Sequence, residues 1–259
     1  VNSSWYSVFM VDADELVVLP FIRVDTISYS SPSTTIAPAA HADGTTAENG
    51  FVTSNDQFNG YRLVLINDDP TESGTIFTIA DSSTGTPDGI LITGDVTGTI
   101  AATECLQMIP PDGTPFVFLG TIFFDASGNL FKFYRTGWDV WWDTRVSISG
   151  VLSTDPGNTG TMTAIPPTAS MAQVDVYCAH SDGTNTQALL VNLYRGTSGT
   201  NTSQQFLERT PAGTTDRSLA ASCLAPITAV AYIRNVFQRQ TTGWVAANLG
   251  ELRIGGYRE

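Results

Sequence analysis

Positive charge is scarce in this 259-residue chain. Lys132 is the only lysine, and 12 cationic side chains face 25 carboxylates, which gives a net charge of −13. Proteins bind a nucleic acid backbone chiefly through clustered Lys and Arg side chains that displace counterions. The sequence contains no such cluster, so it argues against a nucleic acid partner.

Histidine and cysteine are also few. His41 and His180 are the only histidines, which leaves little material for a histidine-based metal site or a catalytic triad. Cys105, Cys178 and Cys223 stand far apart and form no CxxC pair, whereas zinc sites and disulfide frameworks show close pairs or even numbers. We expect three small buried side chains, and one bridge between two of them stays open.

Long apolar runs and familiar catalytic motifs are missing as well. No window approaches the ~18 uninterrupted apolar residues that a membrane helix needs, so the sequence predicts no membrane insertion. A GxSxG nucleophile elbow and a phosphate-binding P-loop are both absent. Together these absences favour a protein that is not an enzyme.

Turn signals and alternating strands make up the rest of the chain. Clusters such as PPDG from Pro110 and SDGTN from Ser181 recur between β-branched or aromatic runs. Within a run, apolar and polar residues alternate, as at Val174, Val176 and Cys178. Further strands are expected at 61–66, 75–80, 116–124, 189–194 and 229–236. The pattern predicts an all-β, antiparallel, jelly-roll-like β-sandwich, with at most a short helix around 102–108.

Residues 27–57 differ from the remainder because they hold few large apolar side chains and many Ser, Thr and Ala. They fit an extended arm that reaches a neighbouring subunit, or an irregular surface excursion of the same domain. We therefore divide the chain into an N-terminal strand and arm for attachment or assembly, residues 1–57, and a β-sandwich domain, residues 58–259.

Aromatic side chains concentrate between residues 121 and 142. Residues 116–124 and 130–134 are expected to form a β-hairpin around a loop at 125–129. Both faces of its first arm are apolar, since Phe118 and Ile122 alternate with Val117 and Leu119. A strand with two apolar faces is covered on both sides, by a second sheet and a loop layer or by another subunit.

The segment after this hairpin supplies the candidate binding or interface residues. In an extended strand, Trp138 and Trp142 would lie on one side. Asp139, Trp141 and Asp143 would lie on the other. Indole rings beside carboxylates fit a sugar site, a subunit interface or the edge of a core. The candidate residues are Trp138, Asp139, Trp141, Trp142 and Asp143.

The order of these segments resembles a β domain of tailed-bacteriophage virion proteins, often labelled tail fibre or minor structural protein. The resemblance rests on FLGTI at 118–122, DASGN at 125–129 and FYRTG at 133–137, and it spans roughly Gly60 to Tyr257. It implies a tail fibre, spike or capsid-surface fibre on the virion surface. Such a protein would assemble as a homo-oligomer, typically a trimer, and would contact other virion proteins, with a host surface glycan as a further candidate.

Two other functions stay open. A capsid decoration, or cement, protein would share all of these compositional features. A glycan-degrading spike enzyme would need two carboxylates, one protonated and one ionised. The acidic residues that offer such pairs are Asp12, Asp14 and Glu15, or Asp139 and Asp143. No motif singles out a catalytic residue among them.

Calcium is the one cofactor that the loops could hold. Oxygen ligands in Asn67–Asp69 or Asp182–Asn185 would suit a hard cation. Ordinary turn capping explains both segments, so no cofactor is expected.

Overall fold

Every regular element in the described part of the chain is a β-strand. The computed structural model describes residues 4–12, 14–38, 54–67, 72–84, 89–102, 104–124, 129–149, 157–161, 165–180, 188–195, 202–209, 217–227, 232–240, 244–247 and 249–259. The strand pairings within these ranges are antiparallel. This confirms the predicted all-β, antiparallel, sandwich-like fold class.

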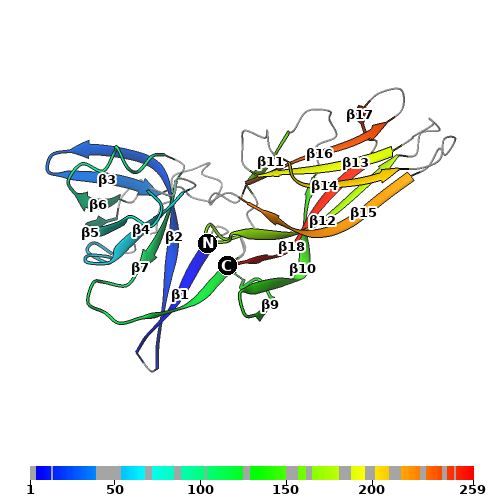
Figure 1. The fold of residues 1–259 in the computed structure, drawn as a ribbon. Coiled ribbons are helices and arrows are strands. Elements are labelled where there is room, and N and C mark those ends of the chain that lie inside the picture. The colour runs from blue at the N-terminus through cyan, green and yellow to red at the C-terminus, as the bar shows by residue number, and fades with distance from the viewer. Residues whose placement is uncertain are drawn as a thin grey trace. The chain divides into compact units, whose positions relative to one another are not determined.

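The chain forms two compact units, Val1–Phe131 and Lys132–Glu259, called here the N-terminal and C-terminal units (Figure 1). The boundary therefore lies after Phe131 and not between residues 57 and 58, where the sequence suggested it. The reason is that residues before 57 supply three strands that pair with later strands of the same unit. Within residues 27–57, positions 27–30 and 33–38 belong to those strands, and 39–53 lie outside the described residues.

In the N-terminal unit, six strands close into a ring, and two more extend from it. Strand β2 pairs with β7 on one side and with β3 on the other, and β6, β5 and β4 complete the circuit. Strand β1 pairs with the first part of β2, and β8 pairs with β1. The strands are β1 (Ser4–Asp12), β2 (Glu15–Ser30), β3 (Ser33–Pro38), β4 (Arg62–Ile66), β5 (Ile76–Ser83), β6 (Gly89–Thr93), β7 (Cys105–Ile109) and β8 (Val117–Phe124).

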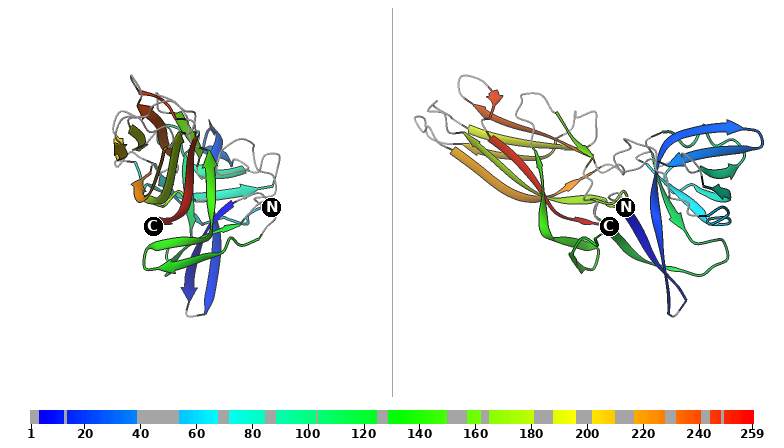
Figure 2. Two further views of the ribbon diagram at one scale, coloured as in Figure 1. Left: turned by 90° about the vertical axis from the view of Figure 1, so that its right-hand side faces the viewer. Right: turned by 180° about the vertical axis from the view of Figure 1, so that it is seen from behind.

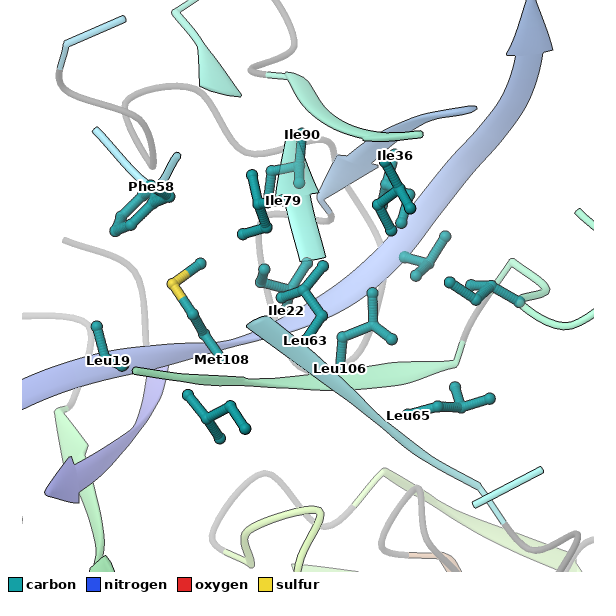
Figure 3. Packing of buried hydrophobic residues seen from close by; sticks show 14 of the residues in the cluster. Leu19, Ile22, Ile36, Phe58, Leu63, Leu65, Ile79, Ile90, Leu106 and Met108 are labelled. Atoms are coloured by element: carbon teal, nitrogen blue, oxygen red, sulfur yellow. The ribbon is translucent and has the colours of Figure 1, made fainter. Parts of the chain in front are cut away.

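The length of β2 makes this arrangement possible, because its 16 residues serve three partners in succession. Positions 15–20 pair with β1, 21–23 with β7 and 24–30 with β3. Aliphatic side chains from all six ring strands fill the interior, as Figure 3 shows. The labelled side chains include Ile22, Ile36, Leu63, Ile79, Ile90 and Leu106.

Two expectations for this unit were wrong. The short helix around 102–108 is the strand β7, since Leu106 and Met108 alternate with Gln107 and enter the ring interior. The hairpin of 116–124 with 130–134 does not form, because β8 takes β1 as its ladder partner. The expected second arm contacts β8 through a bridge between Phe124 and Leu130, a hydrogen bond from the Phe131 amide and an edge-on contact of the Phe131 and Phe123 rings at 6.0 Å.

The C-terminal unit is a sandwich of two antiparallel sheets (Figure 2). As described, one sheet has the order β15-β12-β18-β10-β9, and the other has β11-β16-β13-β14 with β17 beside β16. The strands are β9 (Phe133–Thr136), β10 (Asp139–Ser149), β11 (Gly157–Thr161), β12 (Met171–His180), β13 (Ala188–Arg195), β14 (Thr202–Arg209), β15 (Arg217–Pro226), β16 (Tyr232–Gln240), β17 (Trp244–Ala246) and β18 (Leu249–Arg258).

Strand β12 shows why this sheet has one dry and one wet face. Its burial alternates strictly along Met171–His180, with Val174, Val176 and Cys178 turned inward as predicted. Leu252 and Ile254 of β18 are buried in register with them. The opposite face of the β15-β12-β18-β10-β9 sheet, called here the outer face, carries Asp139, Trp141 and Asp143 of the predicted binding residues.

Candidate binding surfaces

A tight hairpin between β9 and β10 places the first tryptophan. Thr136 pairs with Asp139, so the loop is Gly137 and Trp138 alone. Gly137 has a φ of +61° at the first central position, where a type II′ turn favours glycine. Trp138 is exposed at the tip, and the guanidinium carbon of Arg135 lies 6.0 Å from its ring centroid. This distance is at the outer limit of a cation–π contact.

Trp142 belongs to the core of the C-terminal unit. It is 6% exposed and shares the inner face of β10 with Val140. Its ring meets Phe133 edge-on at 6.4 Å and lies 5.7 Å from Tyr257. Such tilted contacts are favourable geometries for buried aromatic rings. Trp142 is therefore separated from the other predicted residues, and its position excludes direct contact with a ligand on the outer face.

Trp141 and its neighbours lie on the outer face, with Asp139 and Asp143 on the same side of β10. Trp141 is 40% exposed and pairs across the strands with the exposed Tyr134. The Tyr134 hydroxyl donates a hydrogen bond of 3.3 Å to Asp143 Oδ1. Asp139, Trp141 and Asp143 thus share one side of the strand, as expected. Trp141 and Tyr134 lie beside each other there and are called here the aromatic strip.

Asp139 is bound as a carboxylate by an arginine. Arg258 donates two hydrogen bonds to it, from Nε at 2.7 Å and from Nη2 at 3.0 Å. The hydrogen bond from Arg258 holds the pKa of Asp139 below its usual value. The acid of a glycosidase must stay protonated until it donates its proton. The environment of Asp139 instead favours its ionised form, so Asp139 does not suit that role.

Gly256 of β18 pairs with Trp141 and lies very close to the backbone of β10. A Cβ at this position would lie 2.1 Å from the carbonyl oxygen of Val140 and 3.1 Å from Trp141 Cα. Only glycine allows β18 to approach β10 this closely. In the sequence, the pair Gly255 and Gly256 within a strand is the signal of this close approach.

A groove of about 590 Å³ opens farther along the outer face, between strands β10, β12, β15 and β18. Arg145 Nη1 lies 2.7 Å from Asp175 Oδ2, and the Ser222 hydroxyl donates to Asp175 Oδ1. Arg253 donates to both oxygens of Glu251, at 2.8 and 3.1 Å. These five residues come from four separate strands and share no motif, so the sequence carries no signal that brings them together.

The N-terminal unit presents an apolar surface on β1, β2 and β8. Val8 pairs with Val18, and Met10 pairs with both Leu16 and Val117. Leu119 lies at the bulge of β8. We call these six residues the apolar face: Val8, Met10, Leu16, Val18, Val117 and Leu119. Leu16, Val18, Val117 and Leu119 are each 40% to 62% exposed.

The other side of the same three strands is closed. Trp5, Phe9, Leu19 and Phe123 are buried there, and the ring of Phe9 meets Phe116 edge-on at 5.3 Å. Both faces of 116–124 are therefore apolar as predicted, and within this unit the structure covers one of them. The predicted membership of the faces was wrong beyond Leu119, because the bulge there places Phe123 on the buried side with Phe118, and Ile122 on the opposite side.

The cysteines are free thiols in buried or half-buried positions. Burial raises the pKa of Cys105 and of Cys178 to about 12, and the pKa of Cys223 to about 11. Thiols with such values hold their proton at neutral pH, and the thiolate is the reactive form. The expectation of small buried side chains is met by Cys105 and Cys178.

The described ranges contain neither a cluster of metal ligands nor a membrane-spanning helix. No group of three or more His, Cys, Asp or Glu side chains there is arranged to hold a metal ion. Asp68, Asp69 and 182–185 of the calcium candidates lie outside the described residues, while the Asn67 amide donates to Glu72 and Glu104. The described residues form no helix long and apolar enough to cross a bilayer.

Comparison with known proteins adds no relative. The chain matches no protein family model, and a search of curated proteins finds no similar sequence.

Proposed function

We propose that the protein is a non-enzymatic structural component of a tailed-bacteriophage virion, a tail fibre, spike or capsid-surface fibre that assembles as a homotrimer and contacts the host surface. The observation that carries the proposal is the apolar face on β1, β2 and β8. The likeness of residues 118–122 and 125–129 to virion β domains supports the location.

Burial of this face would supply energy for assembly. Leu16, Val18, Val117 and Leu119 each expose about half of their surface, and covering the exposed part gains about 1 kcal/mol for each side chain. The six residues of the apolar face carry no charge, and the carboxylates of Asp12 and Glu15 lie at its end beside Met10 and Leu16. Around a threefold axis, the apolar faces of three chains can pack together at the centre.

The outer face of the C-terminal unit supports the adhesive part of the proposal. Tyr134, Trp138 and Trp141 are exposed together along the β9–β10 hairpin. Exposed tyrosine and tryptophan are enriched where proteins meet ligands and partners. Because Arg258 favours the ionised form of Asp139, Asp139 does not suit the role of the protonated acid in the carboxylate pair of a glycan-degrading enzyme.

Immunogold labelling of intact virions tests the location. Antibody raised against the chain is applied to virions of the phage that encodes it, and the particles are imaged by electron microscopy. Gold at the tail tip, or at fibres on the particle, is the expected result. Gold spread evenly between capsomers would favour the decoration protein instead, and unlabelled particles would refute a virion protein of either kind.

A further inference from the structure

The groove on the outer face is a built arrangement of hydrogen-bonding groups. Asp175 is held by both Arg145 and Ser222, and Arg253 and Glu251 hold each other through two bonds. Paired planar groups lose less conformational freedom when a ligand binds, because their side chains are already fixed. Tyr177 lines the same groove and adds a ring.

One acceptor atom beside this network lacks a hydrogen bond. In the described part of the chain, Gln173 Oε1 is buried and has no hydrogen-bond partner. Asp175 Oδ2 is buried as well, but it forms an ion pair with Arg145 Nη1 at 2.7 Å. Buried acceptors are normally satisfied. Gln173 lies on the outer face of β12, two residues from Asp175, so a ligand that donates a hydrogen bond to Gln173 Oε1 would complete the site.

The charges of the groove select the kind of ligand. Arg145 and Arg253 are balanced by Asp175 and Glu251, so the lining carries no net charge. The whole chain carries −13, which repels anionic ligands at long range. A ligand that fits must both donate and accept hydrogen bonds and must carry no net charge. Hydroxyl groups on a sugar ring meet these requirements.

Trp141 is linked to the groove through the neighbouring strands. Trp141 pairs with Gly256, which in turn pairs with Gln173. A Cβ built at the adjacent Gly255 would lie 3.5 Å from Gln173 Oε1 and 3.9 Å from Arg145 Nε. Gly255 and Gly256 are buried, and the Gln173 and Arg145 side chains lie next to Gly255, between the indole and the polar groove. An extended ligand could stack on Trp141 and hydrogen-bond beyond it.

We propose that this surface binds a neutral oligosaccharide chain, with Arg145, Gln173, Asp175 and Arg253 contacting its hydroxyl groups and Trp141 stacking on one ring. The inference names the ligand class of the adhesive role and rests on the proposed function for that role alone. The binding step is noncovalent.

The test uses the full chain and two immobilised glycan panels, one of neutral gluco-, galacto- and manno-oligosaccharides and one of uronic-acid or sialylated chains. We expect binding to members of the neutral panel and weaker or no binding to the acidic panel. Asp175→Asn should reduce affinity about tenfold or more, since it weakens the contact that orients Arg145.

Asp112→Asn is the matched control, because Asp112 also pairs with an arginine, Arg62, at 3.0 Å, but in the N-terminal unit. It should bind like the wild type. Arg253→Gln provides a second variant if Asp175→Asn unfolds, as circular dichroism would show. Absence of binding to both panels, preference for acidic chains, or full affinity in the folded groove variants would overturn the inference. If the chain binds no glycan while its oligomeric mass is as proposed, the inference fails and the assembly proposal stands.

Discussion

The close approach of β18 to β10 predicts a large effect from a single methyl group. In Gly256→Ala, the new Cβ would lie 2.1 Å from the Val140 carbonyl oxygen, and both nearby groups are backbone atoms of β10. Neither can rotate away, so the two strands must separate locally. Overpacking of this kind costs about 1–3 kcal/mol and more when backbone must move, so we expect destabilisation of about 3 kcal/mol.

The neighbouring glycine provides the control. In Gly255→Ala the nearest atoms would be 3.5 and 3.6 Å away, both in the Gln173 side chain, which is ordinary contact. This variant should change the free energy of unfolding by about 0.5 kcal/mol or less. Urea titration followed by tryptophan fluorescence measures both variants. Equal stability of the two would refute the claimed register between β10 and β18.

Two further predictions concern the hairpin residues. Trp142→Ala should lower the free energy of unfolding by about 3–5 kcal/mol because it empties a core site. Trp141→Ala should leave stability and secondary structure nearly unchanged and weaken binding or assembly. Urea titration, circular dichroism and binding assays compare the two variants, and equal losses of stability would contradict the assigned faces. Because Arg258 lowers the pKa of Asp139 in the folded state, their ion pair stabilises the protein above the unfolded-state pKa of ~3.9, and this stabilisation is lost as pH falls through the lower folded value. The melting-temperature difference between wild type and Asp139→Asn should therefore be positive at pH 7 and shrink below pH ~4; a constant difference would contradict it.

The local pattern of the sequence was sufficient to predict where most strands form and which of their side chains share a face. Period-two alternation correctly predicted the inward side chains of β12 and the shared side of Asp139, Trp141 and Asp143. It failed at β7, because a short apolar run such as residues 105–109 has no length or period that separates helix from strand.

Strand partners could not be predicted, since pairing depends on residues far apart in the chain. The turn at 125–129 suggested a hairpin, but Val8 and Phe9 of β1 lie against β8 instead. The groove was missed for the same reason, because Arg145, Asp175 and Arg253 meet only after β10, β12 and β18 align. The unit boundary was hidden because aromatic residues run continuously across it.

The oligomeric mass in solution tests the central claim most directly. Sedimentation equilibrium of the full chain should give three times the 27.7 kDa of one chain. Leu16→Asp, which places a charge on the apolar face, should reduce this to a single chain. Leu249→Asp, at a 52% exposed leucine of the C-terminal unit, should keep the trimeric mass. A monomeric wild type, or a trimer that Leu16→Asp leaves intact, would contradict the account.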